Sequence, residues 1–592
     1  MTEVGYRRGF ARRGVDSFDR SFFRSSQSVA RIGDGELGGK ARGLVLIRDL
    51  LASQFDQSRF PDVEVYLPKM VVLATDVFDV FIERNELRET ALSDPRDDRI
   101  AAAFLRADLP AEILGDLRAL VEEVHTPLAV RSSSLLEDAL FRPFAGVYET
   151  KMVPNNQPDA DTRFRKLTEA IKFVYASTYF QAAKSYTLAT NQTSADEKMA
   201  VILQEVVGTR YGERFYPNVS GVGRSYNFFP STDVQPEDGV VNLALGLGKT
   251  IVDGGTSWIY SPTRPKAPPP FSSVRELLRL TQLEFWAVNM GQPPAYDPAS
   301  EVEYLVKADL AAADYDDTLF HIASTYDSQQ DRLVPGTRGI GPRVVDFAPL
   351  LRYPQVPLND VIRELLSMGE QALDEAAEIE FAINLPRKGT ARARLGFLQL
   401  RPMLVSTAEV TVTDDELTRP DLLLASDRVM GNGALETILD VVYVKPGRFD
   451  SRFTRQIATE LEQLNRLLLE QNRPYLLLGF GRWGSSDPWL GIPVNWGQIA
   501  GARVIVESTL PKMDVDPSQG AHFFHNIISF QVCYLCVRHD QGAELAHRKI
   551  DWQWLELQPS ASETDYVRHL RLEKPLTVKV DGRSGRGAVW HR

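Results

Sequence analysis

One stretch of this 592-residue chain, residues 129–150, constrains its fold and chemistry more than any other feature. The apolar residues at 128–130 predict a buried strand, which leads into Arg131, three serines and an acidic pair at 137–138. A glycine-containing turn and a second strand-like run follow. A planar guanidinium beside hydroxyl and backbone N–H donors suits a phosphate group. A bare Arg-Ser-Ser would instead indicate a surface arginine beside a serine-rich turn, so the phosphate interpretation depends on the whole stretch.

The same stretch resembles the nucleotide-binding domain of phosphoenolpyruvate synthase and pyruvate phosphate dikinase. The signature of that family runs Val-Arg-Ser-Ser, a short spacer, Glu-Asp, then Ser/Phe-Ala-Gly and an acidic residue followed by threonine. The chain departs from it at Leu135 and Leu136, in a spacer that usually holds small residues, and at Arg142 and Pro143. The resemblance covers residues 30–405 and implies an ATP-grasp-like fold, in which two α/β lobes close on ATP and Mg²⁺.

Length and charge restrict the class of protein. A chain of this length is too long for one hydrophobic core, so several domains are expected. The net charge of −12 argues against a general nucleic-acid-binding role, which usually needs a basic face. No apolar run is long enough for a membrane span, and the N-terminus lacks the apolar core of a secretory signal. The two cysteines, Cys533 and Cys536, lie in an apolar run, which favours buried packing over a redox pair. We therefore expect a cytoplasmic protein.

The patterns along the chain predict mixed α and β structure in several parts. Strand and helix patterns fill the ATP-binding region, with lobes at about 30–215 and 216–405 and one long amphipathic helix at 162–189. A smaller mixed α/β domain is expected after an acidic, threonine-rich linker. The predicted parts outside the lobes are an N-terminal arm (1–29), the linker (406–424), the C-terminal domain (425–575) and a flexible tail (576–592).

A glycine-rich loop at 33–40 is the first candidate for phosphate binding. Its last residues are Gly38, Gly39 and Lys40, and helical apolar spacing follows. Glycines let backbone N–H groups face an anion, and a lysine at a helix start adds positive charge. Alone, the pattern fits a solvated lysine equally well. Because the family has Gly-Gly-Lys at the matching place, the resemblance implies that these residues bind the triphosphate, together with Arg131 and Ser132.

The run 202–207 is the candidate for adenine binding. A strand that turns its backbone edge to solvent can hydrogen-bond an adenine, whereas the residues alone favour a core strand with one polar face. In the family this strand supplies the adenine hinge. The resemblance therefore implies that Gln204, Glu205 and Val206 form the hinge.

Residues 378–383 and 395–400 predict a β-hairpin joined by a polar, basic loop. Side chains on one face of adjacent antiparallel strands can meet, so Glu380 could share a face with Gln399 and Arg401. A carboxylate and an amide oxygen are suitable ligands for Mg²⁺, which also takes phosphate oxygens and waters. The family motifs Asp/Glu-Ile-Glu-Trp/Phe and Leu-Gln-x-Arg-Pro match here. They imply Glu380 and Gln399 as Mg²⁺ ligands and Arg401 as the ligand of the terminal phosphate.

The segment 246–250 is similar to a P-loop only in part, because position 243 is leucine where that motif needs glycine. It is more similar to the family stretch Gly-Leu-Gly-Glu, with Lys249 in place of the acidic residue. This exchange adds positive charge near the expected phosphates, and the sequence leaves its consequence open.

The region after Arg401 does not follow the family. There the ATP-binding domain passes a phosphoryl group to a histidine on a mobile domain, but no Thr-x-His-Ala-Ala loop follows here. The remaining residues are also too few for the enolpyruvate-forming barrel, which needs about 250 residues. We therefore do not expect this chain alone to make phosphoenolpyruvate by the usual route.

Two segments of the C-terminal domain are candidates for the missing function. The loop 479–493 could bind an anionic or planar ligand through Arg482, Ser485, Ser486 and its tryptophans, or it could be a rigid structural loop. The segment 517–526 places His522 near a predicted helix start, where N–H groups would face a phosphoryl group. We predict His522, ahead of His525, as the phosphoryl acceptor, and structural histidines are the alternative.

Together these features predict an ATP-binding phosphotransferase that uses Mg·ATP. The acceptor could be a histidine of this chain, a separate phosphoacceptor protein or a small molecule. One alternative is a non-catalytic ATP sensor that signals to a partner protein, which the missing histidine loop favours. A second alternative is an ATP-grasp ligase, which would form ADP and an acyl phosphate. The intact set of Lys40, Arg131, Glu380, Gln399 and Arg401 favours catalysis.

Overall fold

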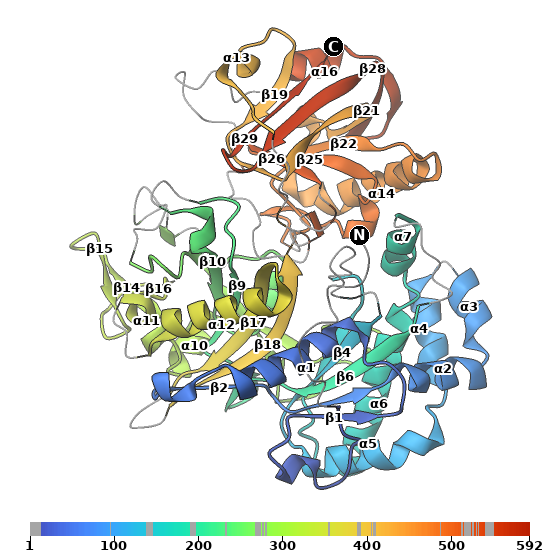
Figure 1. The fold of residues 1–592 in the computed structure, drawn as a ribbon, viewed down its shortest axis with the longest axis vertical. Helices are drawn as coiled ribbons and strands as arrows, with labels where there is room; N and C mark the ends of the chain where they lie inside the picture. Colours follow the sequence, from blue (N-terminus) through green and yellow to red (C-terminus); the bar gives the residue numbers. More distant parts are fainter. Residues whose placement is uncertain are drawn as a thin grey trace.

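The computed structural model places the chain in three parts, which Figure 1 shows as a first lobe at lower right, a second lobe at left and a C-terminal domain at the top. The mixed α/β fold class predicted from the sequence is confirmed. The structure describes residues 14–591, except for 95, 136, 138–145, 190–196, 231–233, 267–273, 275–276, 279–280, 353–355, 387–391, 404, 406–409, 486, 511–512, 514–522, 524–525, 528–529, 531 and 539–549.

The first lobe is built on a five-stranded sheet, in the order β1 (Val29–Ile32), β3 (Met70–Leu73), β6 (Met199–Glu205), β4 (Leu128–Ser134) and β5 (Thr150–Val153). Residues alternate between its faces, as expected for strands. One face, with Val71, Val130 and Leu203, packs against α2 (Thr75–Arg84), α5 (Ala111–Glu123) and α6 (Ala160–Ser177). The opposite face carries Arg131 and Gln204 and lies toward α1 (Gly38–Ser53).

The second lobe is built on a six-stranded sheet, in the order β11 (Trp258–Tyr260), β10 (Val240–Ala244), β9 (Val219–Arg224), β17 (Ala376–Asn384), β18 (Ala393–Met403) and β2 (Val63–Tyr66). The hairpin predicted at 378–400 is confirmed as the antiparallel pair β17 and β18. One face of this sheet packs against α12 (Leu358–Leu373), where Ile362 and Leu365 lie in the same buried cluster as Ile379 and Phe381. The polar residues of the hairpin therefore lie on the other face.

The two lobes are joined by more than the chain that connects them. Strand β2 comes from the first part of the sequence but pairs in parallel with β18. Helix α1 packs on both sheets and crosses the front of Figure 1 between β18 and β4. A Cβ atom at Gly43 of this helix would lie 2.9 Å from Leu400 O, so a residue without a side chain lets the helix approach β18 closely.

Two smaller sheets complete the second lobe. One has the order β13 (Leu305–Asp309), β12 (Glu284–Asn289), β8 (Arg214–Tyr216) and β7 (Thr209–Tyr211). The other has the order β15 (Arg332–Pro335), β14 (Ala323–Asp327) and β16 (Arg343–Val345), and it projects at the left edge of Figure 1. They lie outside the six-stranded sheet that carries the candidate site.

The C-terminal domain is a nine-stranded mixed sheet. Its four central strands run parallel, and they are β21 (Asn432–Val444), β22 (Tyr475–Phe480), β25 (Ala502–Ser508) and β26 (Cys533–Val537). The flanking strands are β19 (Leu422–Ser426), β20 (Val429–Met430), β27 (Ser560–Glu563), β28 (Val567–Asp581) and β29 (Arg586–Trp590). The amphipathic helix α14 (Thr454–Glu470) precedes β22. Cys533 and Cys536 are both buried in β26, as predicted.

Two predictions from the sequence are wrong. The expected flexible tail at 576–592 instead forms the end of β28 and the strand β29, which pair with each other. Its Trp590 is 1% exposed and donates its indole N–H to Glu416 O, so burial of alternating apolar residues outweighs the glycine and arginine content. The long helix expected at 162–189 is divided into α6 and α7 (Gln181–Ala189).

The described part of the N-terminal arm packs on the first lobe. In the described part of the N-terminal arm, Phe18 and Phe22 are buried, and Lys69 Nζ donates to the carbonyls of Phe22, Phe23 and Ser25. Within the described residues, no helix combines the length and apolarity needed to cross a membrane.

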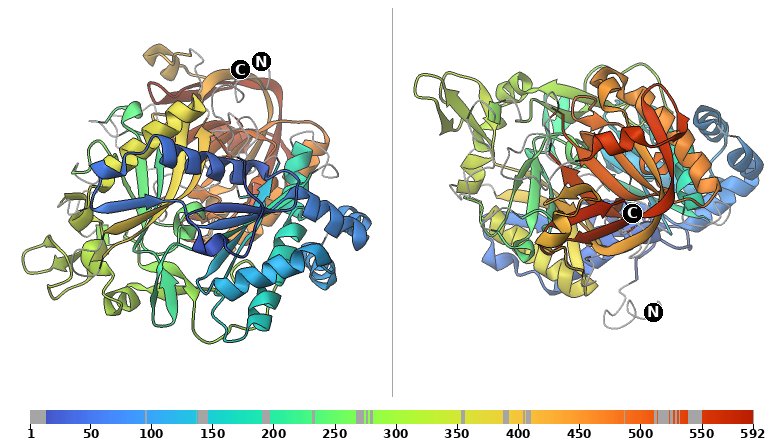
Figure 2. Two further views of the ribbon diagram at one scale, coloured as in Figure 1. Left: turned by 60° about the horizontal axis from the view of Figure 1, so that its bottom comes forward. Right: turned by 90° about the horizontal axis from the view of Figure 1, so that it is seen from above.

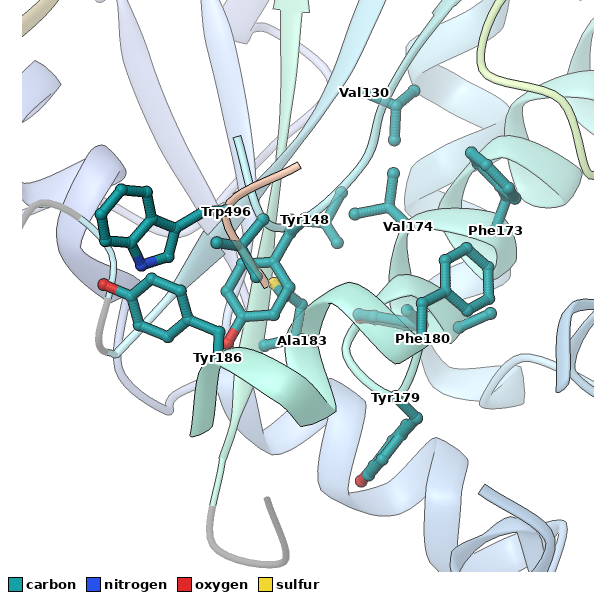
Figure 3. Packing of buried hydrophobic residues seen from close by; sticks show 14 of the residues in the cluster. Val130, Tyr148, Phe173, Val174, Tyr179, Phe180, Ala183, Tyr186 and Trp496 are labelled. Atoms are coloured by element: carbon teal, nitrogen blue, oxygen red, sulfur yellow. The ribbon is translucent and has the colours of Figure 1, made fainter. Parts of the chain in front are cut away.

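The C-terminal domain contacts the first lobe through aromatic rings. Figure 3 shows Tyr186 of α7 beside Trp496, which comes from the C-terminal domain. The ring of Phe530 lies 5.3 Å from that of Tyr186 and stacks on Trp496 at 5.2 Å. Seen from above, the domain lies over the two lobes (Figure 2). The three parts are therefore packed together in this state.

Candidate functional site

The start of helix α1 is fixed against the end of strand β4. Gly38 has φ +75°, and a Cβ atom there would lie 1.8 Å from Ser133 O, so only glycine fits this position. Ser133 Oγ accepts the Ala41 N–H at 3.0 Å and donates to Leu37 O at 2.9 Å. The predicted glycine loop is thus brought to the serine motif of β4.

Lys40 extends from this helix start to a buried carboxylate. Its Nζ lies 2.8 Å from Glu137 Oε1 and 3.2 Å from Ser132 Oγ. Glu137 is 1% exposed and also accepts the Ser132 hydroxyl and the Ser134 N–H, each at 2.9 Å. Sequence reasoning gave Glu137 no role of its own, although it belongs to the motif at 137–138. It is the counter-ion that holds Lys40 at the end of β4.

Arg131 connects the two lobes. Its Nη1 donates to Gln204 Oε1 of the first lobe and to Leu398 O of the second, both at 3.0 Å. Its Nη2 donates to Gln399 Oε1 at 2.9 Å. Arg131 therefore brings together three separate predicted motifs, its own and those of Gln204 and Gln399.

The hairpin of the second lobe carries a buried ionic cluster. Glu378 stands opposite Arg224 of β9 and Arg401 of β18, and Glu380 stands opposite Gln399. Arg224 Nε and Arg401 Nε donate to the two Glu378 oxygens at 2.5 Å each. The exposed fractions of Arg224, Glu378 and Arg401 are only 1%, 0% and 2%.

Sequence reasoning missed the roles of Glu378 and Arg224. The signal for Glu378 was available, because it lies two positions before Glu380 and so shares its face of the strand. Arg224 ends a strand of small and apolar residues, and its local pattern does not name a partner. Burial lowers the pKa of Arg224, and the nearby Glu378 carboxylate opposes that shift. The contact with Glu378 therefore offsets part of the cost of burying the Arg224 charge.

The face of this hairpin has polar atoms available for a ligand. Glu380 Oε1 and Gln204 Nε2 are buried, and neither makes a hydrogen bond. Arg401 Nη2 is 3.6 Å from Glu380 Oε1, which is too long for a hydrogen bond. A carboxylate oxygen next to the Gln399 amide fits a site where Mg²⁺ takes its other ligands from phosphates and water. No group of three or more His, Cys, Asp or Glu side chains that could hold a metal occurs among the described residues.

The predicted hinge residues lie at the end of β6. The N–H groups of Glu205 and Val206 donate to Lys69 O and Pro127 O, at 3.0 and 2.9 Å. Glu205 also accepts the Thr126 hydroxyl at 3.1 Å, and Val206 packs against an apolar cluster that includes Phe215, Leu247, Val288 and Met290. These two N–H groups are bonded within the first lobe, and the adenine hinge stays a prediction.

Lys249 points to acidic partners beside the glycine loop 246–248. Its Nζ lies 2.8 Å from Glu301 and 3.1 Å from Asp253. Burial alone would lower the pKa of this lysine, but the two carboxylates together raise it. The positive charge of the lysine that replaces the family's acidic residue is therefore balanced by two neighbouring carboxylates.

The loop at 479–493 is built around a buried tryptophan. Trp483 is fully buried, its backbone N–H donates to Glu507 Oε1 at 2.8 Å, and its indole N–H donates to Val506 O at 3.2 Å. Ser485 is buried as well. The structural alternative is thus confirmed for Trp483, whereas Arg482 extends to the second lobe. Ser486, His522 and His525 lie outside the described residues.

The buried carboxyl group of Glu507 should make the stability of the protein depend on pH. Burial raises its pKa from 4.5 to about 7, although Tyr534 Oη and the Trp483 N–H both donate to it. The folded state binds the Glu507 proton more tightly than the unfolded state does. This binding therefore contributes fully to the free energy of unfolding below pH 4.5, and the contribution is lost as the pH rises through 7. The shift corresponds to about 3 kcal/mol between these limits. Urea unfolding of Glu507→Gln should lose that part of the wild-type pH dependence, and an unchanged profile would contradict the assignment.

Comparisons with known proteins identify the family of this chain. A family model described as pyruvate phosphate dikinase, AMP/ATP-binding domain, matches residues 35–419, about two thirds of the chain. A Bacillus subtilis (strain 168) protein named Uncharacterized phosphotransferase YvkC is 25% identical over 191 residues, which make up 32% of this chain and 20% of that protein. The chain thus spans about a fifth of the length of that relative. The family resemblance predicted from residues 129–150 is confirmed.

Proposed function

Because the chain belongs to the pyruvate phosphate dikinase AMP/ATP-binding domain family, we propose that it is a phosphotransferase that cleaves Mg·ATP between its two lobes. The observation that carries this proposal is the contact of Arg131 with Gln204 and Gln399, which joins the phosphate motif to both lobes. A cation at this junction is suited to an anion that both lobes enclose.

The triphosphate is assigned to the cations around β4 and β18. The phosphates are assigned to the side chains of Lys40, Arg131 and Ser132 and to the N–H groups of Gly38 and Gly39. Arg401 is assigned to the terminal phosphate. In this structure Lys40 donates to the Glu137 carboxylate, and Arg401 donates to the Glu378 carboxylate. Phosphate oxygens would compete with these carboxylates for the same N–H donors. The adenine is assigned to Gln204, Glu205 and Val206.

The metal is assigned to Glu380 and Gln399, with Mg²⁺ as the ion. The unbonded Glu380 oxygen supports this choice because a buried carboxylate oxygen without a donor suits a cation. When bound, Mg²⁺ would neutralise charge on the phosphates. The protein residues then supply position and positive charge, which is the main protein contribution in phosphoryl transfer.

The acceptor is proposed to be a histidine, with His522 first and His525 second. Full-length protein incubated with Mg²⁺ and ATP labelled at the β-phosphate should yield AMP, acid-labile label on the protein, and unlabelled phosphate from the γ position, which is released to water. His522→Ala should abolish the label, and His525→Ala should retain it. Label that persists in His522→Ala would contradict the choice of His522. Label on an added protein or small molecule would instead identify a separate acceptor.

The same experiment separates the other functions. Mg·ATP binding without any product above background would favour an ATP sensor that reports to a partner protein. ADP with an acyl phosphate, rather than AMP, would identify a ligase. The packing of the C-terminal domain on the second lobe through Arg482 gives the sensor alternative a physical route, since nucleotide-driven movement would reach that domain.

A further inference from the structure

One arginine of the C-terminal domain leaves its own domain and binds the second lobe. Arg482 Nη1 donates to Gly254 O at 3.0 Å and to Gly255 O at 3.4 Å. These glycines follow the short helix α8 (Lys249–Val252), which begins after the glycine loop 246–248. We propose that Arg482 is a positioning residue through which the C-terminal domain sets the geometry of the phosphate end of the site. This inference rests on the proposed function.

The backbone around Arg482 is held on both sides. Gly481 has φ +69° and donates its N–H to Ser508 O at 2.9 Å. The Arg482 N–H donates to Leu490 O at 2.8 Å, and the next residue is the buried Trp483, which is anchored on Glu507. The loop lies at the carboxyl end of a parallel strand, the usual position of functional loops in such sheets. The backbone of Arg482 is therefore held in place by the hydrogen bonds of its neighbours.

The turn that receives Arg482 is equally constrained. Gly254 has φ +73°, and a Cβ atom at Gly255 would lie 2.7 Å from Thr250 O. The N–H groups of Gly254 and Gly255 donate to Ile251 O and Thr250 O, which closes the end of α8. Arg482 thus binds the carbonyls of the turn that follows α8, and the N–H groups of the same two glycines hold that turn to the helix. A displacement of Arg482 is therefore transmitted to α8.

Helix α8 adjoins the face that carries the metal ligands. Its Ile251 packs against Val222 and Ala244 in one buried cluster, and Val222 stands opposite Glu380. In the glycine loop that precedes α8, Gly246 O accepts the Ser220 hydroxyl at 2.7 Å. One contact thus joins α8 to β9, the strand beside Glu380, and a second joins the preceding loop to the same strand. Arg482 can change the site without touching the nucleotide.

The test compares Arg482→Ala and Arg482→Lys in the full-length protein. Arg482→Ala should lower kcat for Mg·ATP about ten- to a hundredfold, the scale expected when a remote change misplaces reacting groups. KM for ATP should change by less than about threefold, because the phosphate and adenine ligands remain. Arg482→Lys should recover most of the loss, since an ammonium can also donate to carbonyls. Arg452→Ala is the control, because that arginine is 72% exposed and pairs with Asp450.

Amide hydrogen exchange gives a second measurement that needs no turnover. Arg482→Ala should accelerate exchange at Asp253, Gly254 and Gly255, and Arg452→Ala should not. Unchanged exchange at these amides, or a kcat equal to that of the wild type, would overturn the proposal. If the wild type neither bound nor cleaved Mg·ATP, the proposed function would be rejected instead, together with the effect of Arg482 on the site. The exchange result would still decide whether Arg482 fixes α8.

Discussion

Arg131→Ala is expected to lower Mg·ATP turnover by about 10²–10³-fold, the loss that follows when one preorganised donor is removed from a site of developing charge. Arg131 is also the contact between the lobes, because it donates to Gln204 on one side and to Leu398 O and Gln399 on the other. Its removal takes away the cation that we propose binds phosphate, and it also removes this contact between the lobes. Steady-state formation of the nucleotide product, with calorimetric titration of Mg·ATP, measures both effects.

Arg131→Lys distinguishes positive charge from geometry. A lysine keeps the charge but cannot reproduce a planar fork that reaches three acceptors, so most of the loss should persist. Arg84→Ala is the matched control, because Arg84 forms a similar two-pronged contact with Glu112 on the surface of the same lobe. It should leave turnover unchanged. If Arg131→Ala retained turnover within about threefold of the wild type, the phosphate assignment of this arginine would be wrong.

The strand pattern made much of the candidate site predictable. Residues two apart on a strand share a face, so the sequence places Gln399 and Arg401 together and allows Glu380 to join them. The register agrees, although a bulge follows Glu380. The bulge lies on the far side of Glu380 from Arg401, and therefore it does not separate the residues of the site. Local periodicity was sufficient here because both strands belong to one hairpin.

Contacts between distant segments were not predictable in this way. Nothing near Lys40 or Arg224 in the sequence names Glu137 or Glu378 as a partner, because these pairs depend on which strands become neighbours. The same limit applies to β2, which leaves the first lobe to pair with β18. The tail was mispredicted for a different reason. Its glycine and arginine content suggested mobility, but its alternating apolar residues complete the edge of a large sheet.

Glu378→Gln is expected to destabilise the protein by about 3–5 kcal/mol, the range measured when one partner of a buried ion pair is removed. Two arginines contact this carboxylate, and all three side chains are almost completely buried. Glutamine keeps the shape but not the charge, so both guanidinium groups lose their main counter-ion. Urea unfolding measures the loss. Glu64→Gln in the same sheet is the control, since its exposed pair with Arg394 should contribute less than about 1 kcal/mol.

Glu380→Gln should behave in the opposite way, although Glu380 lies only two residues from Glu378. Its Oε1 atom makes no hydrogen bond and its ion pair with Arg401 Nη2 is long, at 3.6 Å, so the free energy of unfolding should stay within about 1 kcal/mol of the wild type. Turnover should fall, and the Mg²⁺ concentration needed for half-maximal activity should rise, because a neutral amide is a weaker ligand than a carboxylate. If Glu380→Gln were as unstable as Glu378→Gln and kept the same Mg²⁺ requirement, Glu380 would belong to the structural ion cluster. The two substitutions therefore distinguish a residue that stabilises the fold, Glu378, from a residue proposed to bind Mg²⁺, Glu380.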